Sequence, residues 1–252
     1  MNHRKDELRV IGVPGLPEVS EGMNVGELIA ERIDVAEGDV VVVSQKIVSK
    51  AEGRVRRLSA ASAGDEAKRL AAELNKEPAL VELILAESRE VLRAERGILI
   101  TETQHGFVCA NAGIDTSNLP EADTASLLPE DPDGSARRIR AEIQEVAGLA
   151  PAVIVSDSFG RAWRLGQTEV AIGCAGLAPL DDWRGRADAS GRELEATLIA
   201  IADEAAAAAD LVRNKVSRVP AAIVRGLDRF ISPDDGPGAA ALRRPRDEDL
   251  FR

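Results

Sequence analysis

Two runs of apolar residues constrain the fold of this chain more than any other feature. Val40–Val43 is four consecutive valines, and Ala152–Ser156 is a second apolar run that ends in a hydroxyl. Uninterrupted runs of this kind are typical of strands that are buried on both faces, as in sheets covered by helices on both sides. Segments with helical spacing, among them Gly64–Asn75 and Pro78–Ser88, lie between the predicted strands. The sequence therefore predicts a mixed α/β protein.

Weaker patterns predict several individual elements. Short successive strands, antiparallel to one another, are expected at Val91–Arg93, Ile98–Thr101 and Phe107–Ala110. A helix should begin with Asp133 or Ser135 as its cap. From Gly191 onward the spacing predicts a long alanine-rich helix, with inward-facing residues at Leu194, Leu198, Ile201, Ala205 and Leu211.

Composition excludes several classes of partner. The chain has 252 residues and a formal net charge of -11, which opposes nonspecific binding to nucleic acid and to anionic membranes. With four Phe, two Trp and no Tyr, it also lacks the stacking platforms of single-strand binders. No run approaches the roughly 20 apolar residues of a membrane span, and no apolar signal core follows Met1–Asp6. Cys109 and Cys174 stand in apolar contexts without a CxxC pair, which indicates buried free thiols and a cytoplasmic location.

Two acidic segments are candidate sites. The loop Asn111–Asn118 places Asp115 among amides and hydroxyls, a set that suits a hard divalent cation or a phosphate network, although composition alone favours an ordinary polar turn. Asp157 and Ser158 follow the predicted strand Ala152–Ser156, and an acid beside a hydroxyl at a strand's carboxyl end is frequent in α/β active sites. From the residues alone, either acid could instead be a structural cap.

The most basic stretch of the chain follows the valine run. Its members fall within twelve positions and are Lys46, Lys50, Arg54, Arg56 and Arg57. In so acidic a protein this stretch is the natural place for an anionic ligand, although a solvated face is the simpler interpretation. The phosphate loop, the GxGxxG fingerprint, GxSxG and HExxH are all absent. What remains is two acids and a basic run, a set that would suit phosphoryl transfer with acids holding a metal and basic residues neutralising phosphates, although two acids 42 positions apart do not establish it alone.

Several motifs occur in a fixed order over roughly residues 8 to 228. They are Lys50–Arg54, Asn111–Asn118, Asp131–Ser135, Asp157–Arg161, Asp182–Trp183 with Gly191–Leu194, and Val219–Pro220 with Val224–Gly226. In this order they resemble the coenzyme F-420 γ-glutamyl ligase family. The resemblance implies a family-specific fold with mixed and antiparallel sheets, flanking helices and an intertwined homodimer. Residues 1–231 would form the catalytic region, as one unit or as two interleaved subdomains, and residues 232–252 a mobile tail.

The resemblance also implies an activity. Family members use GTP to add L-glutamate, through an amide bond, to the lactyl phosphodiester of the deazaflavin coenzyme F-420-0, and also to F-420-1, in coenzyme F-420 biosynthesis. GTP converts the terminal carboxylate of the acceptor into an acyl phosphate, and the glutamate amine then displaces phosphate. Mg²⁺ or Mn²⁺ at two sites, and a potassium ion, are the cofactors that the resemblance implies.

The motifs carry residue roles to this chain. Asp115 and Asp157 resemble metal ligands, and Ser158 resembles the hydroxyl ligand beside the second. Lys50 resembles the lysine that faces the phosphates, and with the two acids it completes the catalytic set. Residues that resemble nucleotide contacts are Leu16, Pro17, Glu18, Val19, Gln45, Lys50 and Asn118.

One loop departs from the family pattern. Some relatives place an acidic metal ligand before the last strand, whereas Arg213–Arg218 contains no acid, so Asn214 or water would take that place. Two other functions stay open beside the ligase, the first because no residue is identified that recognises the deazaflavin ring and the second because of this missing acid. One is a related carboxylate–amine ligase with another acceptor, and the other is a nucleotide-binding module without catalysis.

Overall fold

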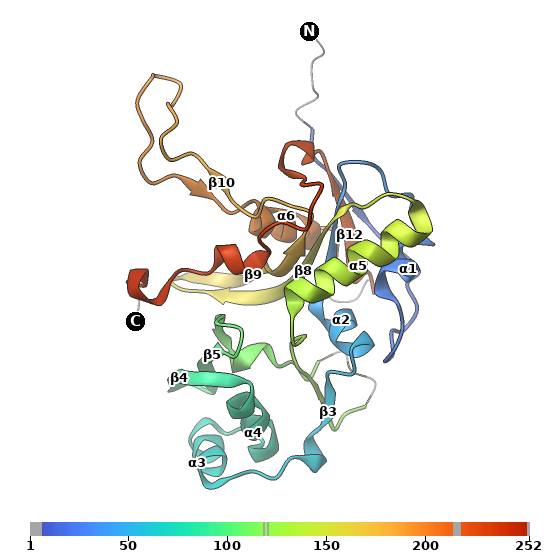
Figure 1. The fold of residues 1–252 in the computed structure, drawn as a ribbon. Coiled ribbons are helices and arrows are strands. Elements are labelled where there is room, and N and C mark those ends of the chain that lie inside the picture. Colours follow the sequence, from blue (N-terminus) through green and yellow to red (C-terminus); the bar gives the residue numbers. More distant parts are fainter. Residues whose placement is uncertain (1–6, 118, 120, 214–217, 251–252) are drawn as a thin grey trace.

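A five-stranded sheet forms the centre of the protein (Figure 1). The computed structural model describes residues 7–117, 119, 121–213 and 218–250. In spatial order the strands are β1 (Arg9–Gly12), β12 (Ala221–Arg225), β2 (Val40–Ser44), β8 (Ala152–Arg161) and β9 (Arg164–Ala175). β2 and β8 run parallel, and the other neighbours in this sheet are antiparallel. The mixed α/β class predicted from the sequence is confirmed.

Both faces of this sheet are buried, as the valine run predicts. Val41 and Val43 pack on one face together with α1 (Val25–Ala30) and α5 (Pro132–Ala147). Val40 and Val42 pack on the other face against α6 (Ile201–Asp210). All four valines are fully buried. Successive side chains of a strand point to opposite faces, so a strand between two helical layers needs apolar residues at every position.

A second, smaller lobe is built from the segment between α2 (Gln45–Ala51) and α5, and it has its own apolar core (Figure 1). Its helices are α3 (Asp65–Leu74), α4 (Pro78–Ala86), η1 (Leu58–Ala60) and η2 (Asn111–Gly113). Its strands are β3 (Val55–Arg57), β4 (Ser88–Glu95), β5 (Ile98–Thr103), β6 (Val108–Ala110) and β7 (Thr124–Ser126). β4, β5 and β6 form an antiparallel sheet, which confirms the prediction of three successive strands.

The helix predicted from Gly191 onward is wrong in its first part. Residues 181–199 instead form an arm that projects from the body and is based on the short strands β10 (Asp181–Asp182) and β11 (Leu198–Ile199) (Figure 1). The carboxylate of Asp188 accepts hydrogen bonds from the backbone of Ser190 and Arg192, which closes a turn where the helix was expected. The helix α6 therefore begins ten residues later, at Ile201, and of the five predicted inward residues Leu198 and Leu211 are exposed.

Two local predictions in the site region also need correction. The cap of α5 is Asp131, whose carboxylate accepts from the backbone N–H of Gly134 at 2.9 Å, rather than Asp133 or Ser135. Asp157 and Ser158 lie inside β8 and not in a loop after it, because β8 and β9 continue as a paired ribbon beyond the sheet. A register shift after Val155 accompanies this change, since a β-bulge redirects a strand without ending its pairing.

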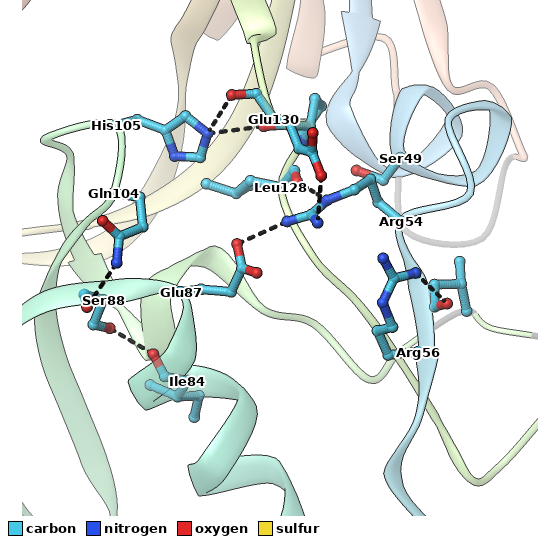
Figure 2. Close-up of polar contacts among 12 residues, drawn as sticks. Ser49, Arg54, Arg56, Ile84, Glu87, Ser88, Gln104, His105, Leu128 and Glu130 are labelled. Carbon is cyan, nitrogen blue, oxygen red and sulfur yellow. Dashed lines mark hydrogen bonds and ion pairs between the residues drawn. The ribbon is translucent and has the colours of Figure 1, made fainter. Parts of the chain in front are cut away.

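Arg54 joins the two lobes through a buried guanidinium (Figure 2). It donates to the backbone carbonyl of Leu128 at 2.9 Å, to Glu87 at 2.8 Å and to Glu130 at 3.1 Å. Glu87 lies at the end of α4 in the small lobe, and Glu130 immediately precedes the cap of α5. A planar group with five donors is suited to such a joint, because it can satisfy acceptors from several segments at once.

The segment from residue 232 to residue 250 makes contacts with both lobes. Asp133 accepts hydrogen bonds from the backbone N–H of Ala239 at 2.7 Å and of Cys174 at 2.9 Å. Farther along, Arg243 lies over the ring of Phe107, and Arg246 pairs with Glu90 at 2.7 Å. The segment contains η4 (Ala239–Leu242) and η5 (Arg246–Glu248), and η3 (Asp228–Phe230) precedes it. The mobility expected of residues 232–252 stays a prediction.

None of the helices in the described ranges is both long and apolar enough to cross a membrane. Cys109 and Cys174 are buried free thiols, as predicted. Burial first, and then the nearby charges of Asp133 and Asp203, raises the pKa of Cys174 to about 12. Because the thiolate is the reactive form, this sulfur is expected to behave as a small apolar side chain.

The joint at Arg54 can be tested by truncation. Arg54→Ala should lower the free energy of unfolding by about 3 kcal/mol, because it leaves the partly buried Glu87 carboxylate without its cation. The measurement is chemical denaturation followed by circular dichroism. Arg56→Ala is the matched control, since Arg56 donates only to the nearby carbonyls of Gly53 and Val55 and is exposed. Its effect should stay within about 0.5 kcal/mol. Equal effects of the two substitutions would contradict the role of Arg54.

The attachment of the C-terminal segment depends on Asp133. Asp133→Ala should release this segment, because the backbone N–H groups of Ala239 and Ala240 lose a charged acceptor, and we expect a loss of about 2 kcal/mol of stability. Limited proteolysis should then cut faster beyond residue 232. Asp131→Ala removes the helix cap and an exposed ion pair with Arg137 but no contact with this segment, so it should cost about 1 kcal/mol and leave the cleavage rate there unchanged. Equal cleavage of both variants would show that Asp133 does not hold the segment.

Candidate functional site

The candidate site lies at the edge where the parallel strands β2 and β8 end. Ser44 of β2 is paired with Ser156 of β8. After Ser44 the chain turns directly into α2, which carries Lys46 and Lys50, whereas β8 continues to Asp157 and Ser158. Parallel neighbours present their carboxyl ends at the same edge of a sheet, which is where ligands bind in α/β proteins. The pairing of these strands therefore brings the basic stretch and the second acidic segment together.

The small lobe delivers Asp115 to this edge. Its backbone forms a bridge with Ser126, with hydrogen bonds of 3.1 and 2.9 Å in the two directions. Its carboxylate receives Lys46 Nζ at 2.6 Å and the backbone N–H of Ser117 at 2.6 Å. Burial would raise the pKa of Asp115, but the Lys46 ammonium and the hydrogen bonds from Ser117 outweigh it and hold the pKa below its ordinary value. Asp115 is therefore an ionised, oriented carboxylate.

The shape of the Asp115 loop is set by the residues before it. Asn111, Ala112 and Gly113 all have positive φ, in a tight turn that buries the Ala112 side chain in the core of the small lobe. A Cβ at Gly113 would lie 2.8 Å from the side chain of Leu128, so this position has no room for one. The turn therefore holds Asp115 in place without contacting a ligand itself.

The pKa of Asp157 is shifted in the opposite direction from that of Asp115. Burial, followed by the negative charge of Glu169, raises the pKa of Asp157 to about 7. Asp115 adds to this increase, whereas the backbone N–H of Ser158 and the charge of Lys46 lower the pKa. The charges of Glu169 and Asp115 thus both act on Asp157, and Lys46 acts on Asp115 and Asp157. The electrostatic field at this edge would therefore favour the binding of an additional positive charge.

Glu169 and Arg213 are the site residues that the sequence analysis missed. Glu169 lies on β9 directly opposite Ser158, and its buried carboxylate pairs with Arg213 at 3.1 Å. It also accepts hydrogen bonds from the hydroxyls of Ser156 and Ser158. In the sequence, the feature that could have identified Glu169 is its position as an acid at the start of the apolar run Glu169–Ala175. Ser158, predicted as a metal ligand, therefore has its proton directed at Glu169, and its oxygen can still act as an acceptor.

The predicted nucleotide contacts gather along α2. Lys46 and Lys50 are four positions apart, so they lie on one side of the helix. Lys50 pairs with Glu18 at 2.5 Å, which brings the turn 16–19 against α2. Pro17 and Glu18 are exposed and Leu16 is half-buried, but the Val19 side chain lies in the core and only its backbone can face a ligand. The acids of two separate loops thus flank the two lysines.

Gln45, the first residue of α2, is fully buried. Its Oε1 accepts from the hydroxyl of Ser49 at 2.8 Å, while its Nε2 has no hydrogen-bond partner among the described residues. An unsatisfied buried amide is costly, so a ligand acceptor here would be stabilising. Asn118 and Asn214, the other predicted contacts, lie outside the described residues.

The residues at this edge fit a hard divalent cation. Within the described ranges, no group of three or more His, Cys, Asp and Glu side chains is placed to hold a metal. Mg²⁺ does not need one, because it is commonly bound by one or two carboxylates together with waters and substrate phosphates. Asp115, Asp157 and the hydroxyl of Ser158 supply hard oxygen donors in a field that already disfavours a second negative charge.

Comparison with known proteins identifies the family of this chain. The family described as F420-0:Gamma-glutamyl ligase matches residues 15–226. A protein named Coenzyme F420:L-glutamate ligase from Methanothermobacter thermautotrophicus is 45% identical over 97% of this chain and 99% of its own length. Proteins of the same name from Haloarcula marismortui (45% identical, 97% of this chain, 96% of its own) and Methanocaldococcus jannaschii (39%, 100% of both) match similarly. The chain therefore belongs to the F420-0:Gamma-glutamyl ligase family.

Proposed function

We propose that this protein is a coenzyme F-420:L-glutamate ligase. It would use GTP to add L-glutamate to F-420-0, and then to F-420-1, as a homodimer in coenzyme F-420 biosynthesis. The observation that carries the proposal is the site on α2, where Lys46 and Lys50 stand between the loop of Asp115 and the turn of Glu18, with Asp157 at the adjacent strand. Family membership over nearly the whole chain supports the activity.

The electrostatics of this edge suit the approach of several anions. The reaction brings GTP phosphates against the acceptor carboxylate, so repulsion must be offset before a phosphoryl group can move. Lys46 and Lys50 would exchange their present carboxylate partners for phosphate oxygens. Asp115, Asp157 and Ser158 would hold Mg²⁺ or Mn²⁺, which neutralises charge on the phosphates when bound.

Two bond changes complete the proposed reaction. The γ-phosphoryl group passes from GTP to an oxygen of the acceptor carboxylate, and GDP leaves. The glutamate amine then attacks the activated carbonyl carbon, the carbon–oxygen bond breaks, phosphate leaves and the nitrogen loses a proton. The network of Glu169 with Arg213 and Ser158 holds β8 and β9 in register beside Asp157, so it keeps Asp157 oriented.

The proposal is tested with purified protein, GTP, Mn²⁺ or Mg²⁺, L-glutamate and F-420-0. Mass spectrometry should detect the glutamylated product, together with GDP in equal amount. GDP release only with another carboxylate acceptor would indicate a related carboxylate–amine ligase. Binding of GTP without turnover for any acceptor would indicate a nucleotide-binding module. The absence of an acid in the loop 213–218 is the feature that favours this last alternative.

The two acids should be essential for turnover and dispensable for folding. Asp115→Asn and Asp157→Asn should each reduce kcat about a hundredfold or more, because a neutral amide no longer supplies the negative charge that holds a cation at the phosphates. Stability should change by less than about 1 kcal/mol, since an amide at position 157 avoids the cost of a buried charge and Asp115 belongs to a partly exposed ion pair. Asp65→Asn, at an exposed position of α3, is the control. Near-normal turnover of either variant would make that acid a structural residue.

Lys50 should contribute to nucleotide affinity. Lys50→Ala is expected to weaken binding of a nonhydrolysable GTP analogue about tenfold, because one charged contact to phosphate is worth roughly 1.4 kcal/mol. Isothermal titration calorimetry measures this directly. Lys68→Ala is the control. Lys68 is exposed on α3 in the small lobe, so its substitution removes the same charge away from α2 and should leave the affinity for the analogue unchanged. Unchanged affinity of the Lys50 variant would assign Lys50 to the ion pair with Glu18 alone.

A further inference from the structure

The ribbon that carries Asp157 and Ser158 extends well beyond the sheet. β8 and β9 remain paired as far as Arg161 and Arg164, and residues 160–167 are all exposed. Figure 1 shows the two strands leaving the body as a two-stranded ribbon. An exposed ribbon adds little to the core of the protein, so its tip calls for a reason of its own.

The tip presents two large apolar side chains to solvent. Trp163 is 81% exposed and Leu165 is 97% exposed, in a chain that has only two Trp and no Tyr. Trp163 also has a φ of 59°, a left-handed conformation that turns normally assign to Gly or Asn. Bulky residues rarely adopt it, and residues held in this way are concentrated at ligand clamps and active sites. A tryptophan at this position is therefore expected to serve a contact.

The charges beside Trp163 suit an anion. Arg161 donates to the backbone carbonyls of Leu165 at 2.7 Å and of Gly166 at 3.4 Å, so its guanidinium is held against the turn. Arg164 is exposed on the facing strand. Neither arginine pairs with an acidic side chain in the described part of the chain, and the partners of Arg161 are carbonyls, although the protein as a whole is strongly acidic. Local positive charge in an acidic protein attracts an anionic ligand.

The length of the ribbon matches the length of the proposed acceptor. Trp163 is six positions after Asp157, and a strand rises about 3.3 Å per residue, so the two lie roughly 15–20 Å apart. In F-420-0 the reacting carboxylate is joined to the flavin-type ring through lactate, a phosphodiester and a sugar-alcohol chain. That connection of about ten bonds spans roughly 13 Å when extended, and the ring adds a few ångströms more.

We propose that the ribbon tip, formed by Arg161, Trp163 and Arg164, binds the deazaflavin end of the acceptor. The ring stacks on the indole of Trp163, because aromatic faces attract one another in offset arrangements. The two guanidinium groups offset the negative charge of the phosphodiester. The carboxylate at the far end of the same molecule then lies along the ribbon at Asp157 and Ser158. This inference rests on the proposed function and adds the part of the site that selects the acceptor.

Steady-state kinetics tests the role in acceptor binding. Trp163→Ala should raise the KM for F-420-0 at least tenfold and leave the KM for GTP within twofold, because the ring contact is lost and the nucleotide site on α2 is untouched. The matched control is Trp183→Ala on the projecting arm, where the indole N–H is bonded to Asp181. It should leave both KM values within twofold. An unchanged KM for F-420-0 in Trp163→Ala would overturn the inference.

Fluorescence separates this inference from the proposed reaction. In Trp183→Phe protein the remaining Trp163 should be quenched saturably by F-420-0, without GTP or glutamate. Saturable quenching without any ligase activity would support the ring site and refute the proposed function. Turnover without quenching would support the proposed function and refute the ring site. Gel filtration of Trp163→Ala tests whether the tip instead contacts a second copy of the chain. Dissociation of the wild-type oligomer into monomers by this substitution would assign the tip to contact with a second copy, and the inference would fail.

Discussion

The parallel pairing of β2 with β8 is the constraint on which the rest of the site depends. It is the one parallel contact in the described five-stranded sheet, and it aligns Ser44 with Ser156 at a common edge. Beyond that edge the two chains diverge, one into α2 with its lysines and the other into the ribbon with Asp157. A slip of one residue would turn the fully buried valines of β2 to the wrong faces, so the packing of both helical layers fixes the register. The positions of the charged groups follow from apolar packing.

The small lobe adds the element that the sheet edge cannot supply. Asp115 reaches Lys46 only because the lobe is held against the body, and Arg54 and the C-terminal segment both make such connections. Arg54 belongs to the basic stretch that suggested an anion site. Its guanidinium is instead occupied by Glu87, Glu130 and a carbonyl, so it serves the joint, while the lysines before it face the site. One run of positive charge is thus divided between structure and ligand binding.

Much of the fold could be predicted from local sequence, but the joining of distant segments could not. The valine run predicted a strand buried on both faces, since that conclusion needs only the residues of the strand itself. The helix expected from Gly191 failed because a side-chain turn at Asp188 competes with helical spacing. For the site, Asp115 and Asp157 could be selected as acids in polar contexts. Glu169 could not, because its importance arises from lying across the ribbon from Ser158 and beside Arg213, which is 44 positions away.

The two aspartates show how one site can prepare for a cation. Lys46 and Ser117 keep the pKa of Asp115 low, so this carboxylate is ionised and already carries a positive partner. Asp157 experiences burial and the charges of Glu169 and Asp115, and its pKa of about 7 reflects the cost of a further negative charge. A cation that bound both carboxylates would remove that cost, and it would leave Lys46 available for a phosphate oxygen. The raised pKa of Asp157 and the pairing of Lys46 with Asp115 both follow from the gathering of acids at this edge, which is the electrostatic setting that the proposed metal–nucleotide complex would use.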